Sequence, residues 1–298
     1  ERALGFYRTP KHTRMKTCNS ISGGKTSAYI AANYPADYNV FALVRTTDKN
    51  CLFPDKKLRQ VVSDKLGVEF IGTLEMDTII YTMLDLEQMI GTKIDWVTGK
   101  PFDEIIIRND KKYLPNVTQR FCTTEMKLQP LFDWWQKEIN EVVEMRIGFR
   151  ANEQSRAKNM LSKANKNGNL EYKTIIGRSK TGTQNKWGLV EWQKPIFPLI
   201  DNPIYKDNVE EFWKDKPVRF AYMNNCVGCF HRNPVLLKHL SKTNANKFQW
   251  FIDAEQDTGY NTRSFKNGMT YEQIKNSLEQ TDLFDEDFDE CDSGHCGL

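Results

Sequence analysis

The chain has 298 residues, of which 39% are hydrophobic and 27% charged, and its formal net charge is +3. This composition is ordinary for a globular protein, and the length suits one large α/β domain or a core with a smaller attachment. No apolar run approaches the roughly 18 residues that span a bilayer and no secretory signal is visible, which excludes a membrane-spanning protein and favours a cytoplasmic one. The net charge is too small to predict a partner by itself.

The first half of the chain alternates apolar strands with helical segments. Residues 1–14 are rich in Arg, Lys and His and precede Met15, so we expect them to be an added or disordered extension. After them the pattern predicts strands at 17–21, 40–46, 68–71 and 142–147, and helices at 26–33, 54–66, 78–90 and 127–139. Strands that alternate with helices imply a parallel sheet covered on both faces, which is an α/β fold.

The pattern changes after Arg156. Residues 163–186 are rich in Asn, Lys and Gly and predict a long loop or an irregular hairpin, and helices follow near 208–213, 235–240 and 271–278. The stretch 156–188 has many basic and few acidic side chains, which is typical of a solvated loop or of a nucleic-acid contact. Acidic side chains gather at 282–290, where we expect a solubilising tail.

Residues 22–27, with the sequence SGGKTS, join the first predicted strand to the first predicted helix. They are not a Walker A loop, because the first glycine of that motif would fall on Asn19. A glycine turn that leads into a helix can nevertheless bind an anion, since the N–H groups at the helix start point at the ligand and the helix dipole favours negative charge. The alternative is a plain strand-to-helix turn.

SGGKTS resembles the SGGxDS loop of the PP-loop ATP pyrophosphatases and the phosphoadenosine phosphosulfate reductases, with Thr26 where the family commonly has Asp. Three more segments resemble the same family in the same order: Arg120-Phe121-Cys122-Thr123 with Lys127 and Pro130, Gly148-Phe149-Arg150 with Glu153 and Arg156, and Cys226-Val227-Gly228-Cys229. The resemblance covers most of residues 16–232.

The resemblance implies a doubly wound, mostly parallel sheet of the adenine nucleotide α-hydrolase-like class. In such a sheet the nucleotide lies across the carboxyl ends of the strands. Residues 15–195 would form the PP-loop nucleotide-binding domain, and residues 196–298 a smaller C-terminal helical region that contains cysteines and ends in the acidic tail.

Members that use ATP bind it with Mg²⁺, release pyrophosphate and adenylate a substrate oxygen. This chemistry requires clamped phosphates, Mg²⁺ and positive side chains placed where negative charge develops on the leaving pyrophosphate. By resemblance, the phosphates would be held by Ser22, Gly23, Gly24, Lys25, Thr26 and Ser27. The catalytic candidates are Lys25, Arg150, Arg156 and Lys127. Alternatively, Arg150, Glu153 and Arg156 form surface salt bridges on one helical face. Thr47 and Asp48 end the second predicted strand, where a ribose or base contact could sit.

The seven cysteines include two close pairs, which in a chain without a secretion signal indicate metal binding or redox chemistry before disulfides. In iron–sulfur members of the family, cysteines of the R-x-C region and the CxxC hold a [4Fe–4S] cluster. Here Thr123 replaces the second cysteine of the first segment, so a cluster on the three cysteines of these segments would take a fourth ligand from the tail or leave one iron open. The candidate ligands are Cys122, Cys226, Cys229, Cys291 and Cys296. Zn²⁺ in a Cys₄ site and reduced thiols are the alternatives.

Three functions remain open. The first is an ATP pyrophosphatase that adenylates a substrate. One use of this reaction would be sulfur transfer to nucleic acid, with a sulfur donor as partner. The ATPase of DNA phosphorothioation systems shares the R-x-C-T pattern and would be its closest functional analogue. The second is a thioredoxin-dependent sulfonucleotide reductase, because the tail His295-Cys296-Gly297-Leu298 resembles the reactive ECGLH tail of those enzymes. The third is a catalytically silent nucleotide- or nucleic-acid-binding module. We favour the first.

Overall fold

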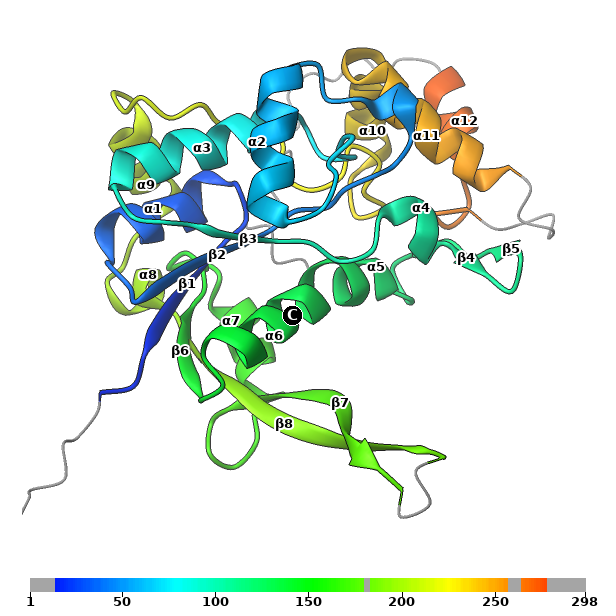
Figure 1. The fold of residues 1–298 in the computed structure, drawn as a ribbon. Helices are drawn as coiled ribbons and strands as arrows, with labels where there is room; N and C mark the ends of the chain where they lie inside the picture. The colour runs from blue at the N-terminus through cyan, green and yellow to red at the C-terminus, as the bar shows by residue number, and fades with distance from the viewer. Residues whose placement is uncertain (1–13, 180–182, 257–263, 278–298) are drawn as a thin grey trace, which may run out of the picture.

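The computed structural model describes residues 14–179, 183–256 and 264–277 (Figure 1). At its centre lies a six-stranded sheet with the order β3-β2-β1-β6-β8-β7. All neighbouring strands are parallel except β7 and β8, which form an antiparallel hairpin at one edge. The strands are β1 (Thr17–Ile21), β2 (Tyr38–Ala42), β3 (Asp95–Val97), β6 (Val143–Arg146), β7 (Leu170–Arg178) and β8 (Asn185–Ile196). The predicted α/β class with a mostly parallel sheet is therefore confirmed.

Helices cover both faces of this sheet. The helices are α1 (Lys25–Asn33), α2 (Lys56–Leu66), α3 (Thr78–Ile90), α4 (Phe102–Ile105), α5 (Phe121–Thr123), α6 (Gln129–Glu138), α7 (Gln154–Leu161), α8 (Pro198–Asp201), α9 (Lys206–Trp213), α10 (Pro234–Thr243), α11 (Ala245–Glu255) and α12 (Tyr271–Asn276). A 3₁₀ turn η1 (Lys49–Cys51), a π-helical turn η2 (Thr124–Leu128) and a small hairpin of β4 (Ile107–Arg108) and β5 (Lys111–Lys112) complete the described elements. Among the residues described, no helix combines the length and apolar character needed to cross a membrane.

The alternation of side chains along β2 separates two hydrophobic clusters. Phe41 and Leu43 pack with residues of α1, α2, α3 and α9 on one face. Val40 and Ala42 pack with residues of α6 and α7 on the other. Both faces of the strand are thus buried, as expected for a parallel sheet between two helical layers.

A third cluster joins the C-terminal helices to the first half of the chain. Residues of α10, α11 and α12 pack with Val44, Leu74, Phe102 and Met126. The helices after residue 196 therefore share a core with segments that follow β2 and α4. Figure 1 shows α10, α11 and α12 side by side next to α4.

Most predicted elements of the first half are confirmed. The strand at 17–21 and the helix at 78–90 match the structure at both ends, and the Asn-, Lys- and Gly-rich stretch forms part of the β7–β8 hairpin. The predicted strand at 68–71 is wrong. The carbonyl groups of Ile71 and of the adjacent Gly72 pair instead with the loop after β2, because Phe53 N–H donates to Ile71 O at 3.0 Å and Thr46 N–H to Gly72 O at 2.9 Å. The short β3 takes the place beside β2.

Candidate functional site

The loop at residues 22–24 lies where the strand order of the sheet reverses. From β1 the chain builds β2 and β3 on one side, and it later enters β6 and β8 on the other. Because β1 and β6 are adjacent and parallel, their carboxyl ends meet at the same edge of the sheet. A Cβ placed on Gly148, just after β6, would lie 3.3 Å from the backbone nitrogen of Ser27. Two of the predicted segments, 22–27 and 148–156, are thus brought together at the position where open α/β sheets bind ligands.

The backbone of this loop requires its first glycine. Gly23 has φ +81°, and a Cβ there would lie 2.7 Å from Cγ2 of Ile79 in α3. Gly24, in an extended conformation, is the N-cap residue of α1, and no side chain there accepts a hydrogen bond from the helix start. The N–H groups of the first helical turn have no acceptor within the helix. They therefore present hydrogen-bond donors and the positive end of the helix dipole to an anion.

The hydroxyl groups of the loop mainly support the loop itself. Ser27 Oγ accepts a hydrogen bond from Ser22 N–H at 3.0 Å and donates one to Gly24 O at 3.1 Å. Thr26 and Ser27 are buried, each with 2% of its surface exposed. Thr26 lies against the loop after β6, since its Cγ2 would be 3.5 Å from a Cβ on Gly148. These two side chains shape the turn, and its backbone donors remain the groups best placed to meet a ligand.

Lys25 is held by α9, which covers the start of α1. Its Nζ forms an ion pair with Glu210, and its carbonyl oxygen accepts a hydrogen bond from Trp213 Nε1 at 2.9 Å. The Lys25 side chain remains about a third exposed. The ammonium group is therefore oriented by a carboxylate but can still be reached by a ligand.

The two predicted arginines share the carboxylate of Glu153. Glu153 Oε2 accepts hydrogen bonds from Arg150 N–H at 2.9 Å and Arg150 Nε at 3.2 Å, and Oε1 accepts one from Arg156 Nη1 at 2.5 Å. Arg156 also lies over the Phe149 ring at 4.5 Å. The alternative of salt bridges among Arg150, Glu153 and Arg156 is confirmed for the pairing. Their predicted position on one exposed helical face is wrong. Arg150 is buried with 7% exposed, and it precedes α7, so the three residues do not share one helical face.

Thr47 and Asp48 are engaged in local structure. Thr47 donates from its N–H and its Oγ1 to Asp103 Oδ2, at 2.6 and 3.1 Å. Asp48 caps η1 by accepting a hydrogen bond from Asn50 N–H at 2.8 Å. Trp250 Nε1 in α11 donates to the other oxygen of Asp103 at 2.7 Å. These contacts attach the segment after β2 to the C-terminal helices.

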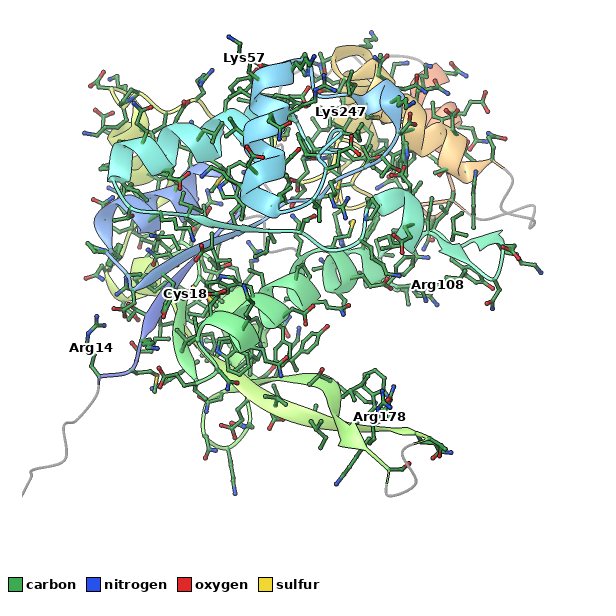
Figure 2. The ribbon with its side chains drawn as sticks, in the orientation of Figure 1. Arg14, Cys18, Lys57, Arg108, Arg178 and Lys247 are labelled. Carbon is green, nitrogen blue, oxygen red and sulfur yellow. The ribbon has the colours of Figure 1, made fainter. Side chains whose placement is uncertain are left out.

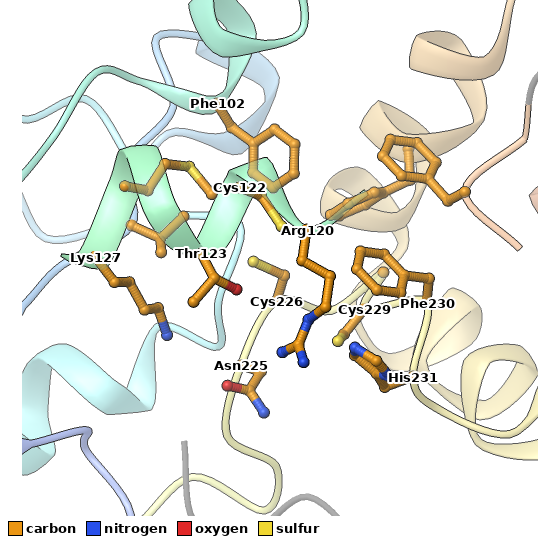
Figure 3. Close-up of a pocket in the computed structure, with 15 residues that line it drawn as sticks. Phe102, Arg120, Cys122, Thr123, Lys127, Asn225, Cys226, Cys229, Phe230 and His231 are labelled. Carbon is orange, nitrogen blue, oxygen red and sulfur yellow. The ribbon is translucent and has the colours of Figure 1, made fainter. Parts of the chain in front are cut away.

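A separate cavity of about 60 Å³ gathers three of the predicted cysteines (Figure 3). Cys122 comes from α5, and Cys226 and Cys229 come from the loop between α9 and α10. None of residues 22–27 lines this cavity. Its other lining residues are Val44, Phe102, Arg120, Thr123, Met126, Lys127, Asn225, Gly228, Phe230, His231, Phe251 and Phe265. The described cysteines form no disulfide.

The CxxC turn is fixed by contacts with three other segments. Cys226 forms an isolated antiparallel β-bridge with Glu75 through the backbone, and Val227 N–H donates to Leu74 O at 2.8 Å. Tyr271 in α12 donates its hydroxyl hydrogen to Gly228 O at 2.8 Å. A Cβ on Gly228 would lie 2.4 Å from the Phe251 ring, so the close packing of the turn on α11 requires glycine.

Lys127 lies in the cavity with the cysteines, where its Nζ donates to Glu75 Oε1 at 3.1 Å. Burial acts to lower the pKa of Lys127, but the carboxylate of Glu75 beside it outweighs this effect, so the pKa is raised. The second oxygen of Glu75, Oε2, is buried without a hydrogen-bond partner in the described part of the chain. Sequence reasoning gave no indication of Glu75, which is distant in sequence from the cysteines that it contacts.

Burial controls the protonation of the groups around the cavity. It raises the pKa of the Cys122 thiol to about 11 and that of Cys226 well above its usual value. It lowers the pKa of His231 to about 4, with further lowering from Arg120 and Lys266. At neutral pH the two thiols are protonated and the imidazole is neutral. A bound metal cation would favour the thiolate forms, since metal ligation requires deprotonated cysteine.

The three thiols do not form a metal site by themselves. Within the described ranges, no group of three or more His, Cys, Asp or Glu side chains is arranged to hold a metal ion. Cys291 and Cys296 lie outside the described residues. Cys122, Cys226 and Cys229 thus supply part of the predicted ligand set, and the iron–sulfur or zinc site stays a prediction.

One short segment connects the glycine loop to the cavity. Glu75 contacts Cys226 and Lys127, and Ile79, four residues later, packs over Gly23. Four residues of extended chain span at most about 14 Å. The two candidate places are therefore neighbours on either side of residues 75–79.

Comparisons of the chain with protein-family models, with curated proteins and with solved structures give no match. Function is therefore inferred from the chemistry of the site, since a fold alone does not determine it.

Proposed function

We propose that the protein is a PP-loop ATP pyrophosphatase with an adenine nucleotide α-hydrolase-like sheet, which binds ATP with Mg²⁺ and adenylates a substrate. One observation carries the proposal: the glycine loop between β1 and α1 lies at the strand-order reversal, directly beside the arginine-bearing loop after β6. A phosphate chain at this edge would meet the donors of α1 and the guanidinium groups of the next loop.

The proposed reaction joins an acceptor oxygen to the α-phosphorus of ATP and breaks the bond between that phosphorus and the oxygen that bridges to the β-phosphate. It requires no nucleophilic side chain, because the leaving group is pyrophosphate and the acceptor supplies the oxygen. What the chain must supply is orientation and positive charge. Backbone N–H groups of α1 and Lys25 would bind the phosphates, and Arg150 and Arg156 would stabilise the charge that develops on pyrophosphate.

Mg²⁺ would enter with the nucleotide. Residues 22–27 contain no carboxylate, since Thr26 stands where an Asp would be expected. Mg²⁺ is commonly bound by substrate phosphates together with waters and few protein ligands. When bound, the ion would neutralise phosphate charge, while the loop's donors fix the position of the chain of phosphates.

The cysteine cavity would serve the sulfur chemistry that the resemblance implies. Cys122, Cys226 and Cys229 would hold a [4Fe–4S] cluster, or Zn²⁺, together with a ligand from outside the described residues. Lys127 would then act from this cavity, where Glu75 orients it, and not from the phosphate clamp.

Calorimetric titration of anaerobically purified protein with ATP and Mg²⁺, and separately with phosphoadenosine phosphosulfate, tests the proposal. We expect tighter binding of ATP, and pyrophosphate release once an acceptor is added. Tighter binding of the sulfonucleotide, with sulfite release in the presence of thioredoxin, would replace the proposal with a reductase. Binding without turnover of either would indicate a silent module, and absence of binding would reduce the loop to a structural turn.

A further inference from the structure

The β7–β8 hairpin extends beyond the rest of the sheet (Figure 1). In β8, residues 193–196 pair with β6, and residues 185–193 pair with β7. Gln193 thus pairs on both sides. Since β8 is parallel to β6, the outer part of the hairpin lies past the amino ends of the central strands. The glycine loop follows the carboxyl end of β1. The outer part of the hairpin and the candidate nucleotide site therefore lie at opposite ends of the strands.

One face of this hairpin exposes apolar side chains. Lys173 pairs with Leu189 and Ile175 with Trp187, which places these four residues on the same face. Leu189 is 63% exposed and Trp187 57%. On the opposite face, Tyr172 stacks on Phe132 of α6 at 4.5 Å. The solvent face of an antiparallel pair is normally polar, so this face has the character of a binding surface.

The charge of the hairpin specifies the partner. The sequence has no Asp or Glu between residues 172 and 190. Lys173 pairs with Leu189 and Arg178 with Asn185, so both basic side chains lie on the same face as Trp187, whereas Lys186 points to the opposite face. Lys173 and Arg178 are exposed and form no ion pair with the residues described. A second copy of the same hairpin would bring like charges together, whereas a polyanion would neutralise them.

We propose that this face binds single-stranded nucleic acid, with a base stacked on Trp187 and phosphates bound by Lys173 and Arg178. Exposed aromatic rings beside basic side chains are the usual means of holding single strands, because each unpaired base offers a flat face for stacking. In a duplex those faces are occupied by neighbouring base pairs. The surface is separate from the nucleotide site, so its binding does not depend on the proposed reaction.

Fluorescence anisotropy with labelled single-stranded DNA and RNA of mixed sequence tests the proposal, with the full chain, without ATP and at several salt concentrations. Trp187→Phe keeps a flat ring and is expected to bind within threefold of the unaltered protein, while Trp187→Leu keeps only apolar bulk and should weaken binding at least fivefold. Neutralising Lys173 and Arg178 together should reduce the salt slope by about 0.7 for each phosphate that these side chains neutralise in the unaltered protein.

Lys57→Gln on α2 is the matched charge control, because Lys57 is exposed and lies far from Arg178 in the molecule (Figure 2). Equal binding by Trp187→Phe and Trp187→Leu, or tighter binding of a duplex than of its single strands, would overturn the proposal. So would sedimentation showing a dimer that is absent in the double charge variant or in Trp187→Leu, since the face would then join two copies. The comparison of DNA with RNA shows which strand is preferred.

Discussion

The glycine loop and the cysteine cavity are assembled in opposite ways. The loop takes its chemistry from residues 22–27 alone, and its donors are mainly backbone groups at the start of α1. The cavity takes its thiols from α5 and from a loop about a hundred residues later, and α11 and α12 hold that loop in place. A local motif can be read from consecutive residues, whereas the cavity exists only because the C-terminal helices pack on the first half of the chain.

The largest effect is expected in the cavity, through its metal content. Anaerobically purified protein is expected to carry iron, or zinc as the alternative, and Cys226→Ser should lose it, because a site with one thiolate fewer binds metal far more weakly. Elemental analysis measures this. Cys51→Ala is the control, since Cys51 is buried but does not line the cavity. Metal-free wild-type protein, or equal metal in Cys226→Ser, would contradict the expectation.

The glycine loop should be most sensitive at its first glycine. Gly23→Ala combines a left-handed backbone with a close approach to Ile79 and should lower the free energy of unfolding by about 2–4 kcal/mol. Gly67→Ala is the matched control, because Gly67 has φ +68° with no atom near its Cβ position, and it should cost about 1 kcal/mol. Urea denaturation compares them. Equal effects would mean that the approach to Ile79 is not restrictive.

Replacing Arg150 should separate binding from folding. Arg150→Ala is expected to weaken ATP binding by about tenfold to a hundredfold, the effect of one charge-assisted hydrogen bond. The backbone N–H of Arg150 and the side chain of Arg156 still donate to Glu153, so the chain should remain folded. Calorimetry and circular dichroism measure the two quantities. Arg108→Ala is the control, and unchanged ATP affinity in Arg150→Ala would remove this residue from the clamp.

The smallest expected effect is a pH dependence of the free energy of unfolding, caused by Glu255 in α11. Burial raises the pKa of Glu255 to about 7, although the N–H groups of Tyr271 and Phe265 act to lower it. The folded protein therefore binds this proton more readily than the unfolded chain does. The contribution is fully present below about pH 4.5 and is lost as the pH rises through about 7.

Glu255→Gln should remove this dependence. Because Glu255 is partly exposed, we expect the difference in unfolding free energy between the variant and the wild type to change by only about 1 kcal/mol between pH 5 and pH 8. Urea denaturation at both pH values measures it. A difference that is independent of pH would mean that the carboxyl titrates normally.

The sequence predicted the parts that neighbouring residues determine, and missed the parts that depend on contacts between distant residues. The first strand, the glycine turn and α3 were predictable because neighbouring residues determine them. The strand expected at 68–71 was wrong because its apolar pattern does not show that the carbonyl groups of Ile71 and the adjacent Gly72 pair with the loop after β2. Glu75, the partner of Lys127, could not be predicted, since no spacing relates it to the CxxC. The exposed side of the β7–β8 hairpin also required the strand register, which places Trp187 opposite Ile175.

The central claim is that the β1–α1 loop binds nucleotide phosphates, and a pair of variants tests it most directly. Lys25 and Glu210 form an ion pair, so a purely structural role would make both partners equally important. Calorimetric titration with ATP and Mg²⁺ should show at least tenfold weaker binding for Lys25→Ala, and unchanged or tighter binding for Glu210→Gln, which releases the lysine. Equal weakening in both variants, or no change in Lys25→Ala, would contradict the assignment of this loop as the nucleotide site.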